Sequence, residues 1–337
     1  MKSPTLLEDL PNELLEEIFD HMRLSDVFYT FYHLNRRFHQ LSINLQHYKF
    51  VSYSPEDTID PYLMNFPLKI STLVVAHSKR LILPFNYQNF VNVEHLILRN
   101  PTREQWNQID RHNFPNLKTL HLVDSVFTYR TEHLCCVVFS NEFPFLTKCS
   151  LPFVADASVS LWKTSSSLTS VTAAFWDLSV FYQILKSCPN LIYFKIRIKG
   201  NYDQQSLVSS PLRQKHIGLR YFVLRPSKSI KLNVIDAFLH VLPKLEYFSL
   251  KSNDLQGSSI SPAVLASILE QRTPELRRVR IDLTLNKTVC DSSFHPINFY
   301  LFKRFDLYRE EHKPPRLIIN QQCWNNFLSF QIFQTRE

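Results

Sequence analysis

The feature that most constrains the fold is a short apolar phrase that returns along most of the chain. It reads apolar, two variable residues, apolar, one variable residue, apolar, as in Leu117-x-x-Leu120-x-Leu122. The copies start 22 to 31 residues apart, at Ile70, Val93, Leu117, Leu146, Leu168, Leu191, Leu219, Leu245 and Leu276. The alternation within each copy predicts a short strand with one buried face. Recurrence at this period indicates a stack of similar units.

The segments between the copies carry signals for helices. Helices are expected near Asp177, near Asn233 and at Ser261-Pro262, because apolar residues follow each position at helical spacing. A proline often stands just ahead of the phrase, as in Cys188-Pro189-Asn190, where it ends a helix and favours extended backbone. A doubly wound sheet is the alternative, but its strands need longer apolar runs that are buried on both faces. We therefore expect an α/β solenoid with parallel strands on its concave side and helices on its convex side.

One copy carries a more specific resemblance. Leu245-x-x-Phe248-x-Leu250-x-x-Asn253-x-Leu255 matches the pattern of leucine-rich repeats, including its asparagine, which the other copies lack. Residues 66–296 therefore resemble an irregular array of about nine leucine-rich repeats. Residues 297–337 break the phrase and are expected to form a C-terminal cap, because a solenoid needs its last repeat covered.

The first fifty residues predict three short helices. Pro11 and Asn12 can open the first helix, whose apolar stripe is Leu14, Leu15, Ile18, Phe19 and Met22. Ser25 and Asp26 can cap the second helix, and Asn35 can cap the third. A unit of this size buries too little surface to be stable alone, so its remaining apolar face must meet something else. A helical cap on the repeats would be the simplest reading.

The ordered motifs favour another reading. Leu10-Pro11-x-Glu13, Ile18-Phe19, Asp26-Val27-Phe28 and Arg37-Phe38 stand in the order and spacing of an F-box, which residues 4–50 resemble. The second half departs from the family, because Asn35-Arg36-Arg37-Phe38 replaces the common Cys-Arg-x-Trp. The resemblance implies that a Skp-type adaptor binds this segment and that the adaptor links it to a cullin scaffold. The positions that it implies for adaptor contact are Leu10, Pro11, Leu14, Ile18, Leu24 and Val27.

Composition disfavours enzyme chemistry. The chain has only three glycines, so phosphate-cradling loops of the Walker or dinucleotide type are not expected. The six cysteines and thirteen histidines show no metal-ligand spacing, and no nucleophile motif is present. We expect no catalytic site, metal or cofactor. The N-terminus lacks the apolar run of a signal peptide, and no apolar stretch could span a membrane, so a cytoplasmic or nuclear protein is expected.

Positive charge is concentrated late in the repeats. Residues 190–282 hold fifteen Lys and Arg against seven Asp and Glu, which gives this segment a net charge of +8. Strand alternation places the variable residues of the phrase on the concave face. There, stacked repeats should align a column of tyrosines beside a column of cations, which is a plausible surface for an acidic or phosphorylated protein substrate. The candidate substrate-binding residues are Tyr193, Arg197, Tyr221, Arg225, Tyr247, Lys251, Arg278 and Arg280.

An F-box followed by leucine-rich repeats resembles the substrate receptor of an SCF-type cullin–RING ubiquitin ligase. Such a receptor holds its substrate near a charged conjugating enzyme and performs no covalent chemistry itself. The alternative is a repeat module without a ubiquitin role that binds nucleic acid through the basic repeats 190–282. An acidic F-box-like N-terminus disfavours that alternative, since a nucleic-acid binder has no use for it.

Overall fold

The computed structural model describes residues 6–22, 24–45, 48–52, 67–76, 90–123, 132–154, 162–199, 215–227, 230–252, 262–286, 317–318 and 327–333. The chain is an α/β protein that divides into two compact units. Unit 1 comprises residues 1–138 and 142–152, and unit 2 comprises residues 139–141 and 153–337.

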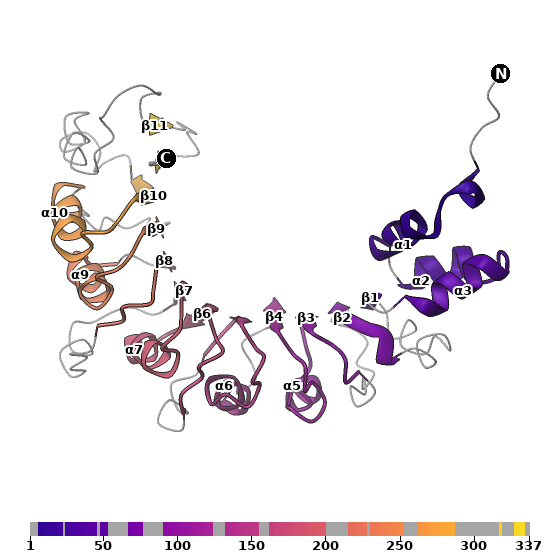
Figure 1. The fold of residues 1–337 in the computed structure, drawn as a ribbon. Helices are drawn as coiled ribbons and strands as arrows, with labels where there is room; N and C mark the ends of the chain where they lie inside the picture. The colour runs from indigo at the N-terminus through magenta and orange to yellow at the C-terminus, as the bar shows by residue number, and fades with distance from the viewer. Residues whose placement is uncertain are drawn as a thin grey trace, which may run out of the picture. The chain divides into compact units, whose positions relative to one another are not determined.

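Unit 1 begins with the expected three helices (Figure 1). They are α1 (Asn12–Asp20), α2 (Leu24–Val27), which runs into the π-helical segment Phe28–Tyr32, and α3 (Arg36–Asn44). The predicted cap of α3 is confirmed, because the Asn35 side chain accepts a hydrogen bond of 3.0 Å from the backbone of Phe38. The predicted caps of α2 are wrong, since that helix already begins at Leu24. Leu24 at this helix start is 1% exposed, and the free energy gained by burying its side chain replaces the contribution of a capping side chain.

An aromatic cluster holds the three helices together. The ring centroids of Phe19 and Phe31 are 4.8 Å apart, and Phe38 lies 5.5 Å from Phe31 and 6.2 Å from Phe19. All three side chains are buried, and Leu15 beside them is fully buried. The helices therefore have a small core of their own, which leaves the rest of the α1 stripe free to face outward.

A strand that the sequence did not predict joins these helices to the sheet of unit 1. Strand β1 (Tyr48–Ser52) pairs in parallel with β2. The Tyr48 ring lies 6.1 Å from that of Phe28, and its hydroxyl donates to the backbone carbonyl of Ser42. The expected helical segment 4–50 therefore ends in a strand. Leu45-x-x-Tyr48-x-Phe50 has the spacing of the phrase, but residues 4–50 were predicted to be helical, so this strand was not expected.

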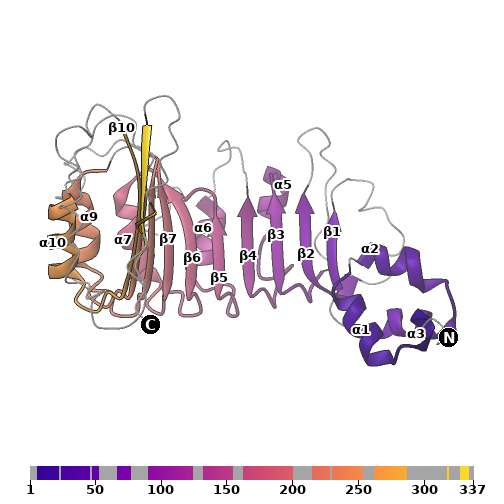
Figure 2. The ribbon, with the colours of Figure 1, turned by 90° about the horizontal axis from the view of Figure 1, so that it is seen from above.

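The sheet of unit 1 continues with one strand for each copy of the phrase. Strands β2 (Ile70–Ala76), β3 (His95–Arg99), β4 (Thr119–Val123) and β5 (Lys148–Leu151) follow β1 in chain order, all parallel (Figure 2). The helices α5 (Arg103–Asn107) and α6 (Glu132–Phe139) follow β3 and β4. Helix α5 has an unpredicted capping box, in which Thr102 and Gln105 each accept from the other's backbone N–H.

Asparagines ahead of the phrase link successive repeats. The side-chain amides of Asn92 and Asn116 donate to the backbone carbonyls of Leu68 and Val91, at 2.6 and 3.2 Å. In unit 2, Asn190 donates in the same way to Ser166, at 2.8 Å. Each acceptor lies 24 or 25 residues earlier, in the preceding repeat. These bonds satisfy turn carbonyls that the parallel ladder leaves open.

Unit 2 holds the remaining strands. Strands β6 (Ser170–Phe175), β7 (Tyr193–Ile198), β8 (Tyr221–Pro226), β9 (Tyr247–Ser252) and β10 (Arg278–Asn286) are parallel and in chain order. All nine predicted phrases therefore form strands. Within the expected cap, β12 (Phe327–Phe333) pairs antiparallel with β10, and β11 (Leu317–Ile318) pairs with β12. The rest of residues 297–337 lies outside the described residues.

The helices of unit 2 cover one face of its strands. They are α7 (Leu178–Ser187), α9 (Leu232–His240) and α10 (Pro262–Arg272), and Figure 1 shows them on the same side of β7–β10. Asp177 caps α7 through a 2.7 Å bond from the backbone of Ser179, as predicted. Helix α9 begins at Leu232, one residue before Asn233.

Phenylalanines fill the space between these strands and helices. The phrase residues Phe194, Phe222 and Phe248 are fully buried, and so is Leu120 at the equivalent position in unit 1. Phe222 lies 5.9 Å from Phe248 and 6.2 Å from Phe194, measured between ring centroids. The helices contribute Phe181 and Phe238, at 5.8 and 6.1 Å from Phe222. The prediction that the apolar positions of the phrase face the helices is therefore confirmed for these residues.

Candidate functional site

Two surfaces and one pocket are candidates for function. The first surface is on α1, where Leu14 is 45% exposed and Ile18 is 37% exposed. Because they are four residues apart, both side chains lie on one face of the helix. Glu13, Glu16 and Glu17 are also exposed, so acidic side chains flank the apolar pair on this helix. An exposed apolar pair on a helix whose core is already filled is available to a partner.

Arginine 37 holds the segment ahead of α1 in place. Its Nε donates to the side-chain oxygen of Asn12 at 2.8 Å. Its two terminal nitrogens donate to the backbone carbonyls of Glu8 and Leu10. Asn12 therefore bonds to Arg37 rather than capping α1. As a result, the Leu10-Pro11 step is fixed against α3, with Pro11 exposed and Leu10 half-buried.

Two of the six predicted adaptor contacts do not belong to this surface. Leu24 is 1% exposed and Val27 is fully buried, so both pack inside the helices. Neither side chain is accessible in the free chain, so adaptor contact at these two positions stays a prediction that the exposed surface does not support. The four positions that remain accessible are Leu10, Pro11, Leu14 and Ile18.

The second surface lies on the face of the unit 2 strands opposite the helices α7, α9 and α10. Since Phe194, Phe222 and Phe248 point to the helices, strand alternation turns their neighbours to the opposite face. There we define the tyrosine–arginine face as Tyr193, Lys195, Arg197, Tyr221, Arg225 and Tyr247.

The strand register produces the expected tyrosine column. Tyr193 pairs with Tyr221, Tyr221 pairs with Tyr247, and Tyr247 pairs with Arg278. The rings of Tyr221 and Tyr247 are 6.1 Å apart. Burial raises the pKa of Tyr193, an effect that the nearby Arg225 opposes. The three tyrosines are therefore register neighbours on three adjacent strands.

The cation column has the predicted members Arg197, Arg225 and Lys251 and ends at Asp282. Arg197 and Arg225 are direct neighbours in the ladder. Lys251 lies at the corresponding level of β9, but the acidic residue Asp282 occupies the position opposite it. Arg280 pairs with Ser249 and thus belongs to the middle column, together with Lys195 and Val223. The predicted residues are on one face, but their charges are densest on β7 and β8.

Sequence reasoning missed Trp176, which immediately follows β6. The backbone of Lys199 bonds to the carbonyl of Phe175 at 3.0 Å, so the ladder continues there and places Trp176 opposite Lys199. The Trp176 side chain is 54% exposed and lies 6.4 Å from the ring of Phe153. Its position directly after an alternating strand is the signal that could have identified it.

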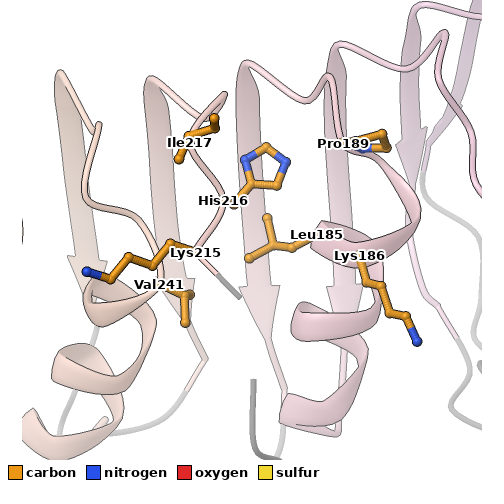
Figure 3. Close-up of a pocket in the computed structure, with 7 residues that line it drawn as sticks. All are labelled: Leu185, Lys186, Pro189, Lys215, His216, Ile217 and Val241. Carbon is orange, nitrogen blue, oxygen red and sulfur yellow. The ribbon is translucent and has the colours of Figure 1, made fainter. Parts of the chain in front are cut away.

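A small pocket lies between the ends of α7 and α9 and the loop before β8 (Figure 3). It is lined by Leu185, Lys186, Pro189, Lys215, His216, Ile217 and Val241. The backbone of Leu219 donates to Nδ1 of His216, so the ring proton is on Nε2, which donates to the Cys188 carbonyl at 3.0 Å. Burial lowers the pKa of His216. In Figure 3 the amines of Lys186 and Lys215 point away from the imidazole.

This histidine has a structural role. Both ring nitrogens bond to backbone groups, which leaves neither free for proton transfer. Next to it, a Cβ at Gly218 would lie 3.3 Å from the Pro189 carbonyl oxygen, so glycine permits the close approach of the two turns. The pocket therefore marks a junction between repeats.

No protein-family model matches the chain, and no similar protein was found among curated proteins. Within the part of the chain that the structure describes, no group of three His, Cys, Asp or Glu side chains could hold a metal ion. None of the helices in that part is long and apolar enough to cross a membrane. The two surfaces therefore have to be interpreted from their own chemistry.

Proposed function

We propose that this chain is the substrate-recognition subunit of an SCF-type cullin–RING ubiquitin ligase. In this proposal residues 4–50 are an F-box that docks on a Skp-type adaptor, and residues 66–296 are an irregular leucine-rich-repeat solenoid that binds a protein substrate. The observation that carries the proposal is the exposed pair Leu14 and Ile18, on a helix that follows a fixed Leu10-Pro11 step. Both features lie at the positions that the F-box resemblance assigns to adaptor contact.

The division between the two surfaces supports a receptor rather than an enzyme. The α1 surface is apolar with an acidic surround, whereas the tyrosine–arginine face is aromatic and cationic. One chain can thus hold two different partners at once. A receptor of this kind accelerates ubiquitin transfer by raising the effective concentration of substrate lysines near the conjugating enzyme.

The test is capture of the adaptor. The full chain is co-expressed with a Skp-type adaptor and purified through a tag, and wild type is compared with the double variant Leu14→Glu, Ile18→Glu. Each apolar side chain removed from an interface costs about 1.5–3 kcal/mol, so the variant should lose the adaptor. Both positions are exposed in the free chain, so the variant should remain folded by circular dichroism.

A matched control uses the same chemistry elsewhere. Ile192 and Ile217 are 44% and 70% exposed and belong to unit 2. Their double change to Glu should leave adaptor capture unchanged. If wild type captures no adaptor, or if the Leu14 and Ile18 variant captures as much as wild type, the proposed function is wrong.

A further inference from the structure

The cations of the tyrosine–arginine face differ from other cations of unit 2 in lacking counter-charges. Arg220 lies 3.7 Å from a Glu246 carboxylate oxygen and 3.4 Å from one of Glu275. Arg272 likewise pairs with Asp236 through two hydrogen bonds. Among the residues that the structure describes, no carboxylate pairs with Lys195, Arg197 or Arg225. Their positive charge is therefore uncompensated within this part of the protein.

These three cations also lie close enough to affect one another. Burial lowers the pKa of Lys195, and the positive charges of Arg225 and Arg197 lower it further. The Nε atom of Arg225 is buried and has no acceptor among the described residues. Leaving a buried donor of a charged group unpaired is costly. An anion placed between the two guanidinium groups would supply the acceptor and relieve the repulsion.

The tyrosines beside the cations offer a complementary kind of contact. Tyr221 is 41% exposed, and Tyr193 and Tyr247 flank it in the ladder. Tyrosine provides rigid apolar area with a polar tip, which suits the backbone and side chains of a peptide. The exposed Trp176 directly follows the neighbouring strand β6 and adds aromatic area.

We propose that the tyrosine–arginine face binds an anionic peptide segment, with a carboxylate or phosphate between Arg197 and Arg225 and flanking residues on the tyrosines. This assignment deepens the proposed function, on which it rests for the statement that the segment belongs to a ligase substrate. A peptide fits better than nucleic acid because the unpaired cations are few and clustered. Nucleic-acid binders typically neutralise about 6–10 phosphates along a continuous track. Here the positions on β6 beside the cluster are Thr172 and Ala174, which carry no charge.

The test is direct binding by the full chain in complex with its adaptor. The probes are fluorescent 12-residue peptide libraries with a fixed central phosphothreonine, a fixed pair of glutamates or a fixed threonine, together with a 20-nucleotide single-stranded RNA. We expect the two anionic libraries to bind at least about tenfold more tightly than the neutral one, since hydrogen bonds between charged groups are the strong ones. The stronger of the two identifies the source of the charge. Binding should weaken as salt rises.

The decisive variant is Arg197→Glu, Arg225→Glu, and the matched control is Lys163→Glu, Lys231→Glu, at two exposed cations of the same unit. The first should lose about tenfold or more in affinity, and the control should keep wild-type binding. If the Arg197→Glu, Arg225→Glu variant misfolds, the single variant Arg225→Gln is used instead, and it should also bind the anionic libraries more weakly than wild type. The proposal is overturned if the neutral library binds as well as the anionic ones. It is also overturned if the reversal has no effect, or if the RNA displaces the bound peptides and binds more tightly.

Failure of this proposal and failure of the proposed function give different results. A chain that captures the adaptor but shows no preference for anionic peptides retains its function and loses this assignment. If the chain captures no adaptor, peptide binding is measured on the chain alone. Preference for the anionic libraries in that measurement would keep the anionic-peptide assignment, while the ligase role would be lost.

Discussion

Replacing Phe222 by Ala tests the central packing claim of unit 2. Phe222 is fully buried, and four other phenylalanine rings have centroids within 6.2 Å of it. Truncating a buried phenylalanine to alanine costs about 3–5 kcal/mol. Aromatic pairs contribute about 0.5–1.5 kcal/mol beyond the area that they bury. Because four ring contacts are lost together, we expect a loss of about 4–5 kcal/mol in the free energy of unfolding of unit 2.

The assay is urea unfolding followed by tryptophan fluorescence, combined with hydrogen exchange. Since repeats contact mainly their neighbours, protection should fall in β7 and β9 and persist in β2–β4. Phe145→Ala is the matched control, because that side chain is 55% exposed, and it should cost less than about 0.5 kcal/mol. If Phe222→Ala prevents folding, Phe222→Leu should still show a loss of about 1–1.5 kcal/mol. A cost for Phe222→Ala below about 2 kcal/mol, or equal loss of protection in both units, would refute the reasoning.

Two further predictions concern charged groups. Burial lowers the pKa of His216 below its ordinary value of 6.5, so the unfolded state binds the proton more readily. The contribution of His216 to the free energy of unfolding is therefore fully present above pH 6.5 and is lost as the pH falls toward the lowered pKa. In a plot of the urea midpoint against pH, His216→Gln should have a smaller slope below pH 6.5 than wild type. A variant curve that runs parallel to that of wild type would contradict the prediction. Asp236 and Arg272 join α9 to α10 through bonds of 2.7 and 3.1 Å but are about a third exposed. A double-mutant cycle with Asp236→Asn and Arg272→Met should give a coupling free energy of about 0.3–1 kcal/mol in urea unfolding, and this energy should decrease in 1 M salt. A coupling free energy that does not change with salt would contradict an electrostatic origin and show that packing dominates.

Features that depend on short-range patterns were predictable from the sequence. The phrase located nine strands, because a period-two alternation of apolar residues identifies a half-buried strand without knowledge of its neighbours. Asn35 and Asp177 were recognised as helix caps for the same reason, since a cap bonds within its own turn. Alternation and repeat spacing together also predicted the tyrosine column, which the register confirms.

Features that depend on tertiary packing were not predictable in this way. Leu14 and Leu24 are both apolar residues of predicted helices, yet one is exposed and the other is buried, and the apolar pattern alone does not distinguish them. Strand β1 pairs with β2 directly after the third helix, and the helical prediction for residues 4–50 concealed the phrase Leu45-x-x-Tyr48-x-Phe50 at its end.

The tyrosine column runs across the three parallel strands β7, β8 and β9, and its length limits how many residues of a ligand can contact it. Neighbouring strands are about 4.8 Å apart, so the column from Tyr193 to Tyr247 spans about 10 Å. An extended peptide advances about 3.3 Å per residue, so only about three residues lie over the column. A motif of that length with one required negative charge recurs in many proteins. Selectivity must therefore come from a second contact on the same target, and binding through this face alone would be broad and weak.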